Sequence, residues 1–284
     1  MLIANPIYDS VFKYLMEDTR VAKRLLSILT GEEILEIETR SQEQTLRDEL
    51  RMFTLLRLDF VAVVLTKTGE RKKILIELQK GKQPIDILRF RRYIGQHYTK
   101  QDVVDGEKTE LPLLVVYFLG FKLGVQYPVL KVNRVYRDAV SGKTIEEKDA
   151  FIEKLSHDCF VVQIPLLPQR TQNKVEKVLS VFNQKWVKDE ENNWIMNFQG
   201  DTDDEDLNLV TNRLHIAAQD EEVQQRIEAE EAFESALDNW VREQAIKLEQ
   251  KEQLIVEKEQ QLEQKEQQIE ELKRLLEQEK KKKT

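Results

Sequence analysis

Residues 57–80 of the chain read RLDFVAVVLTKTGERKKILIELQK. The first part of this stretch is rich in β-branched residues, and a second apolar run follows it, a composition typical of two strands. Between the two runs lie Lys67, Thr68 and Gly69. Three residues suit a hairpin loop whose glycine adopts a left-handed backbone conformation. The stretch therefore predicts a β-hairpin.

The register of this hairpin follows from its loop. Because the loop is centred on Thr68, residues equally distant from Thr68 face each other, which places Asp59 opposite Glu77. Side chains alternate along a strand, so the residues of the hairpin divide between two faces. Arg57, Asp59, Glu77 and Gln79 share one face, and the other, which is the core face, carries Leu58, Phe60, Ala62, Ile74, Ile76 and Leu78. A bulge at Gly69 would move the pairing by one position.

Two carboxylates that face each other across a strand pair repel, so positive charge is expected between Asp59 and Glu77. One arrangement is an ion-pair cluster at the end of the strand, with Arg57 or Lys80. The other is a divalent cation, since Mg²⁺ is typically held by one or two carboxylates together with water and substrate phosphate. Spacing alone leaves both open.

Asp59, followed by Glu77, Leu78 and Gln79 at the end of the next strand, resembles the PD-(D/E)xK nuclease motif with glutamine in place of lysine. Residues 9–13 (DSVFK) near the start of the chain and residues 89–93 (RFRRY) after the hairpin extend the likeness. With these elements, about residues 5–200 resemble the Rpn family of recombination-promoting nucleases, often described as transposase-like.

The resemblance implies a restriction-endonuclease-like α/β fold, in which helices flank a mixed sheet, and the hydrolysis of DNA with bound Mg²⁺ or Mn²⁺. The implied catalytic residues are Lys13, Asp59, Glu77 and Gln79, the implied metal ligands are Asp59, Glu77 and the carbonyl of Leu78, Asp9 supports the active site, and Lys80, Lys82, Arg89 and Arg92 contact the nucleic acid.

Two positions depart from the motif. Leu58 stands where the motif has proline, which is a mild change, and Gln79 stands where it has lysine. Glutamine can orient a water but adds no positive charge, and loss of one such contact often costs about 10²-fold in rate. Lys13 is a candidate to restore the charge. Lys80 points to the opposite face if the strand stays regular.

The charge distribution favours nucleic acid more than the net charge of −8 suggests. Residues 71–100 contain nine basic residues against Glu77 and Asp86, whereas residues 186–231 contain fourteen acidic residues against three basic ones. Salt screens distant charge within about 10 Å, so a locally basic region can bind phosphates on an acidic protein.

Several classes are disfavoured by composition. The apolar runs are shorter than the roughly 20 residues that cross a bilayer, and the first residues do not resemble a signal peptide. Cys159 is the one cysteine, which fits a reducing cytosol, and the three histidines lack the spacing of zinc ligands. We therefore expect a cytoplasmic protein without a membrane partner.

The final segment has a different character. After Gly200 the chain has no glycine or proline, and a seven-residue repeat of apolar residues begins at Leu248. Its members are Leu248, Ile255, Leu262, Ile269 and Leu276. The repeat indicates a coiled coil and a homodimer, although lysines at the second seam position are equally compatible with a single charged helix. The expected domains are 1–200 (nuclease-like), 201–245 (helical) and 246–284 (coiled coil or charged helix).

Three functions remain open at this point. The first is a Mg²⁺-dependent DNA endonuclease, connected to recombination or mobile elements. The second is a nuclease-fold protein that binds DNA but cuts weakly or not at all because of Gln79. The third is a coiled-coil interaction protein with no affinity for nucleic acid.

Overall fold

A computed structural model describes residues 1–39, 60–81, 86–189, 192–200 and 203–282. A mixed sheet of six strands, in the order β2-β3-β4-β7-β11-β8, forms its centre. In this sheet β4, β7 and β11 run parallel to one another, and the remaining neighbours pair antiparallel. The predicted mixed sheet flanked by helices is confirmed.

The strands are β1 (Leu2–Ala4), β2 (Ile34–Thr39), β3 (Phe60–Thr66), β4 (Arg71–Gln79), β5 (Asp102–Val104), β6 (Glu107–Thr109), β7 (Leu113–Leu119), β8 (Val129–Val132), β9 (Tyr136–Arg137), β10 (Thr144–Ile145), β11 (Asp158–Gln163) and β12 (Ile195–Asn197). The α-helices are α1 (Asp9–Glu17), α2 (Thr19–Thr30), α3 (Asp86–Thr99), α4 (Ala150–Leu155), α5 (Lys174–Leu179), α6 (Glu205–Ala217) and α7 (Glu221–Lys282). Short 3-10 helices are η1 (Ile164–Leu166), η2 (Ser180–Phe182) and η3 (Gln184–Trp186).

The hairpin of β3 and β4 has the predicted register. Paired residues are equally distant from Thr68, from Leu65 opposite Arg71 to Phe60 opposite Ile76, and no bulge shifts them. Gly69 has φ 82°, the left-handed conformation that the loop requires. The described part of β3 begins at Phe60, so the position opposite Glu77 lies outside the described residues.

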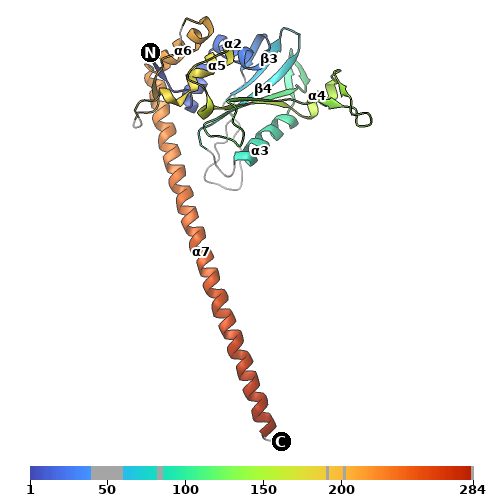
Figure 1. Ribbon diagram of the computed structural model, residues 1–284, viewed down its shortest axis with the longest axis vertical. Coiled ribbons are helices and arrows are strands. Elements are labelled where there is room, and N and C mark those ends of the chain that lie inside the picture. Colours follow the sequence, from blue (N-terminus) through green and yellow to red (C-terminus); the bar gives the residue numbers. More distant parts are fainter. Residues whose placement is uncertain (40–59, 82–85, 190–191, 201–202, 283–284) are drawn as a thin grey trace. The chain divides into compact units, whose positions relative to one another are not determined.

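Helices cover both faces of the sheet. On one face, apolar residues of β3 and β4 join a large core with α1, α2, α5 and α6. From the hairpin, that core contains Phe60, Ala62, Val64, Ile74, Ile76 and Leu78. On the other face Val61, Leu75 and Val115 pack against Tyr93 of α3. Figure 1 shows α2, α5 and α6 on one side of β3 and β4, and α3 on the other. The described part of the predicted core face is thus confirmed.

The chain divides into two compact units, residues 1–230 and 231–284. This division differs from the predicted boundaries near residues 200 and 245, because α6 packs against α1, α2 and β1. The start of α7 also belongs to the first unit, since Val223 and Ile227 are buried in its core. Among the described helices, none combines the length and the apolar character needed to span a membrane.

Candidate functional site

Among the predicted site residues whose side chains the structure describes, Glu77 is the most deeply buried. It lies near the carboxyl end of β4 and is only 3% exposed. Alternation along β4 directs its side chain to the face covered by α3, and its neighbour in β7 is Tyr117. Burial, together with the nearby Cys159 and Glu77 side chains, raises the pKa of the Tyr117 hydroxyl. The surroundings of Glu77 are therefore largely shielded from water.

Gln79 is the last residue of β4, and its position is held from two sides. Its side-chain amide donates to the carbonyl oxygen of Gly81 over 2.8 Å, and its backbone carbonyl oxygen accepts the N–H of Gly120 over 2.7 Å. At Gly120 the backbones come very close, since a Cβ there would lie 2.1 Å from the carbonyl oxygen of Lys80. Glycine at this position lets β7 support the end of β4.

Three of the predicted site residues lie wholly or partly outside the described part of the chain. Asp59 and Lys82 lie outside the described residues, and Arg89 lies in α3 without a described side chain. Arg92 is exposed on α3. The convergence of Asp59 with Glu77 and Gln79 therefore stays a prediction, which rests on the confirmed register of the hairpin.

Asp9 and Lys13 form an ion pair on the first turns of α1. This helix packs through Phe12 against Phe118 and Phe182 in the large core, on the face of the sheet opposite the one to which Glu77 points. A third element, the first part of α7, contacts both α1 and the residue that follows β4.

Glu230 of α7 makes that connection. Its Oε1 accepts the backbone N–H of Asp9 over 2.9 Å, and its Oε2 accepts the N–H of Ser10 over 3.0 Å. The ammonium of Lys80 lies 2.6 Å from Oε1 and 3.8 Å from the ring centre of Tyr8. Sequence reasoning missed Glu230. One signal was available, because Tyr8 precedes the helix where a capping side chain is usually found.

The basic stretch predicted around the site is divided between the two ends of β4. Arg71, Lys72 and Lys73 are at the amino end, far from Gln79, and each has a carboxylate partner. The ammonium of Lys73 is almost fully buried and lies 2.5 Å from Asp102. Two of the predicted nucleic-acid contacts, Lys80 and Arg92, follow the carboxyl end of β4 in the chain.

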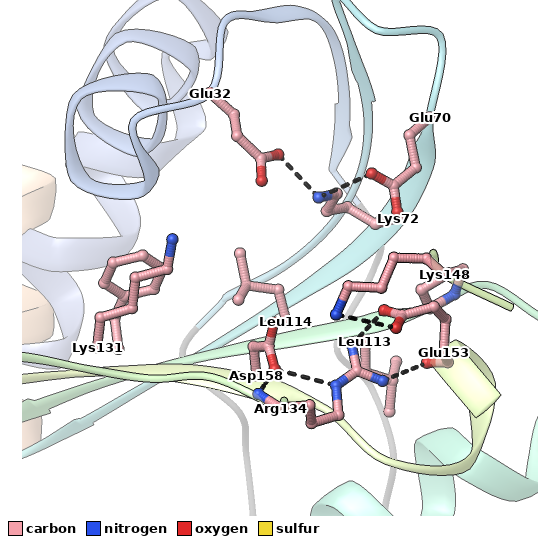
Figure 2. A pocket seen from close by; sticks show the side chains of 12 residues that line it. Glu32, Glu70, Lys72, Leu113, Leu114, Lys131, Arg134, Lys148, Glu153 and Asp158 are labelled. Atoms are coloured by element: carbon pink, nitrogen blue, oxygen red, sulfur yellow. Dashed lines mark hydrogen bonds and ion pairs between the residues drawn. The ribbon is translucent and has the colours of Figure 1, made fainter. Parts of the chain in front are cut away.

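A pocket of about 320 Å³ opens at the amino ends of the parallel strands, at the end of β4 away from Gln79 (Figure 2). Its lining holds four basic and four acidic side chains, and dashed lines in Figure 2 connect most of them. They are Lys72, Lys131, Arg134 and Lys148 with Glu32, Glu70, Glu153 and Asp158. Arg134 alone contacts both Glu153, over 2.6 Å, and Asp158, over 3.0 Å.

The charges of this pocket balance one another. Burial opposes the charge of Lys72, yet contacts with Glu32 and Glu70 raise the pKa of its ammonium. Burial likewise opposes the charge of Asp158, but hydrogen bonds from Arg134 lower the pKa of that carboxyl. The pocket is thus held by internal ion pairs, and neither the hairpin motif nor the sequence analysis pointed to it.

The described residues contain no group of three or more histidine, cysteine, aspartate or glutamate side chains that could hold a metal ion. Of the predicted metal ligands, Glu77 and Leu78 are among the described residues, whereas Asp59 lies outside them.

Cys159 is a free, half-buried thiol, and burial and the charge of Asp158 raise its pKa. It therefore stays protonated at neutral pH.

Comparison of the chain with protein-family profiles, with curated proteins and with solved structures finds no match.

Proposed function

We propose that the protein is a metal-dependent DNA endonuclease with a restriction-endonuclease-like fold. One observation supports the proposal: the register observed from Phe60 to Leu65 would bring Asp59 opposite the buried carboxylate of Glu77 if it continued by one residue pair. A charged group this far from water is expected to have positive charge or several donors near it. A divalent cation held jointly by Glu77 and Asp59 would supply positive charge of this kind.

The residues present fit such a cation in their chemistry. Glu77 and the carbonyl of Leu78 offer hard oxygen donors, the type that Mg²⁺ and Mn²⁺ prefer, and Asp59 would add a second carboxylate. When bound, the metal polarises the phosphoryl group and lowers the pKa of a water. The amide of Gln79 would orient a water beside it, and Lys80 and Arg92 would contact phosphates of the DNA backbone.

Cleavage of a supercoiled plasmid in Mg²⁺, Mn²⁺ or EDTA tests this proposal. We expect nicking in either metal and none in EDTA, and we expect Asp59→Ala and Glu77→Ala to abolish it. Glu70→Ala is the matched control, because Glu70 lies in the same hairpin but lines the pocket at its other end. Cleavage that survives Glu77→Ala would overturn the proposal.

Thermal unfolding in EDTA separates catalysis from structure. Removing one of two repelling carboxylates should leave the stability of Glu77→Ala unchanged or slightly raised. A large loss of stability in EDTA would assign Glu77 to a structural ion pair instead.

The second candidate is a nuclease-fold protein that binds DNA without cutting it. Gln79 favours this candidate, because its neutral amide, which donates a hydrogen bond to Gly81, stands where the motif has the ammonium group of a lysine. This candidate predicts DNA affinity that falls steeply with salt, and no cleavage in either metal. Gln79→Lys distinguishes the two, because it should create cleavage in a binding protein and change an existing rate in an enzyme.

A further inference from the structure

The pocket at the amino ends of β4, β7 and β11 combines charged sides with an apolar lining (Figure 2). Leu114 of β7 and Phe160 of β11 contribute to that lining, and both belong to the large core, with only 7% and 5% of their surface exposed. The volume of about 320 Å³ falls within the range of about 300–1,000 Å³ that is usual for small-molecule sites. The pocket is therefore large enough for a small molecule with an apolar part.

One side of the pocket carries an excess of negative charge. The ammonium of Lys72, whose side chain is only 12% exposed, lies 2.8 Å from Glu32 and 3.2 Å from Glu70. One largely buried ammonium thus pairs with two carboxylates. Both glutamate side chains remain nearly half exposed, so this side can bind a cationic group of a ligand.

The opposite side is balanced within itself. Arg134 lies 2.6 Å from Glu153 and 3.0 Å from Asp158, and Lys148 lies 3.7 Å from Glu153. Two cations therefore offset two carboxylates. These ion pairs fix the positions of the side chains that form this side, but they leave no net charge for a ligand.

Lys131 of β8 differs from the other cations of the lining. In the described part of the chain its ammonium has no carboxylate partner, and it lies 5.3 Å from the ring centre of Phe160. Figure 2 shows Lys131 apart from both groups of ion pairs. Its ammonium is thus available to an anionic group of a ligand.

The charges of the lining determine the net charge of a suitable ligand. The four basic and four acidic side chains sum to zero, so a ligand without net charge preserves the balance. A ligand with only a cation or only an anion would leave the excess carboxylate or the Lys131 ammonium without its counterpart, and unpaired charge is costly where water is partly excluded. A molecule with one ammonium and one carboxylate group satisfies both.

We propose that this pocket binds a small zwitterion, a molecule in which an apolar body carries one ammonium and one carboxylate group, such as a hydrophobic amino acid. The ammonium of the ligand donates to Glu32 and Glu70, and its carboxylate pairs with Lys131. The apolar body packs on Leu114 and Phe160. The pocket lies at the end of β4 away from the candidate active site, so this inference does not depend on the cleavage of DNA.

Ligand-observed NMR titration of the full chain tests the proposal. Two zwitterions are the probes: L-leucine, whose charged groups share one carbon, and 6-aminohexanoate, whose charged groups stand at the ends of an apolar chain. Each has two analogues that keep the apolar body and lack one charge. For leucine these are 4-methylpentanoate and 3-methylbutylamine, and for 6-aminohexanoate they are hexanoate and pentylamine.

We expect at least one zwitterion to bind at least about tenfold more tightly than either of its own analogues, because hydrogen bonds between charged groups are the strong ones. This comparison uses the natural protein alone, so it decides the proposal whether or not a variant folds. Failure of both zwitterions to bind at up to about 10 mM, or equal affinity for each zwitterion and one of its analogues, would overturn the proposal.

Two variants with matched controls assign the charges to residues. Glu32→Gln keeps the shape of the side chain and removes its charge, and Glu33→Gln removes the same charge from the next residue, which lies outside the lining. Lys131→Gln removes the ammonium, and Lys122→Gln removes the same charge from an exposed position outside the lining.

Both pocket variants should bind the zwitterion at least about tenfold more weakly, whereas the two controls should resemble the natural protein. In Lys131→Gln the zwitterion should also lose its advantage over the amine. In Glu32→Gln it should lose its advantage over the carboxylate, because Lys72 then balances Glu70. Affinities that are unchanged in both Glu32→Gln and Lys131→Gln would overturn the assignment of the ligand to this pocket.

Discussion

At the scale of single residues, His97 of α3 has an unusual environment. Burial, followed by the positive charges of Lys73 and Lys100, lowers the pKa of its ring to about 4, although Asp102 acts in the opposite direction. Its Nδ1 is buried and has no hydrogen-bond partner in the described part of the chain. The folded protein therefore keeps this histidine neutral at pH values where the unfolded chain protonates it.

His97 is expected to make the protein less stable in mild acid. Between pH 6.5 and 4 the unfolded state binds more protons at this residue, so the free energy of unfolding falls as pH decreases through that window. From pH 7 to 4.5, we expect the natural protein to lose about 1–2 kcal/mol more than His97→Gln, after allowance for the solvent that reaches the ring. Urea unfolding at both pH values checks this, and parallel losses in the two proteins would contradict it.

Asp102 balances a lysine that is almost out of contact with water. Lys73 is 2% exposed, and Asp102 is its ion-pair partner at 2.5 Å. Removing one partner of a buried pair leaves an uncompensated charge, so Asp102→Asn is expected to lower the free energy of unfolding by about 3 kcal/mol. Urea unfolding at pH 7 measures the change.

Asp105→Asn is the matched control for that substitution. Asp105 pairs with Arg71 at 3.2 Å but is largely exposed, and asparagine tolerates its φ of 52°. An exposed pair contributes little, so we expect a change within about 0.5 kcal/mol. If Asp102→Asn and Asp105→Asn lowered the free energy of unfolding by similar amounts, burial of Lys73 would not be the cause of the destabilisation.

At the scale of elements, the contact between the ends of β4 and β7 depends on Gly120. Alanine there would bring its Cβ to 2.1 Å from the carbonyl oxygen and 2.9 Å from the carbonyl carbon of Lys80, and backbone atoms cannot yield as a flexible side chain does. We expect Gly120→Ala to lower the free energy of unfolding by about 1–3 kcal/mol, the usual cost of overpacking.

Gly124→Ala provides the comparison, because a Cβ at Gly124 meets nothing within 4 Å. Its unfolding should match that of the natural protein to within about 0.5 kcal/mol. If the proposed function holds, Gly120→Ala should also reduce cleavage more than Gly124→Ala does, since it displaces the strand end that carries Gln79.

At the scale of the whole molecule, the second unit leaves an apolar stripe in water. Four members of the seven-residue repeat in α7 are 51–60% exposed: Leu248, Ile255, Leu262 and Ile269. Two parallel copies would bury this stripe, from Leu248 to Ile269, along roughly 32 Å at a rise of about 1.5 Å per residue. Each buried leucine or isoleucine contributes about 1.5–3 kcal/mol, from which the cost of the seam lysines and of ordering must be subtracted.

We therefore expect a homodimer that dissociates near micromolar concentration and depends on the end of α7. Sedimentation of the full chain and of a chain shortened to end at Ala245 measures this directly. A dimer would also give a nuclease one active site for each DNA strand. Equal monomer masses for the two chains at tens of micromolar would identify the repeat as a single charged helix or as a docking site for another protein.

Local sequence signals were sufficient for the register of the hairpin. The distance from the loop centre predicted the pairing of Phe60 with Ile76, because strand alternation and loop length are properties of adjacent residues. The ends of α2 are likewise set by adjacent residues, since the Asp18 side chain accepts the N–H of Arg20 at its start and Gly31 ends it with φ 75°. The short strand β1, paired with β12 almost two hundred residues later, gave no comparable signal.

Only the tertiary structure decided how the charges are used. The sequence by itself determined a basic stretch and an acidic one, but packing directed Lys73 to Asp102 and Lys80 to Glu230. Periodicity reports which face of an element is buried, because burial repeats with the geometry of that element. An ion pair has no such period, and its two members become neighbours only when the packed core brings distant segments together. For that reason Glu77 could be found from the hairpin alone. The contact of Glu230, in α7, with the first turn of α1 could not be found from the sequence.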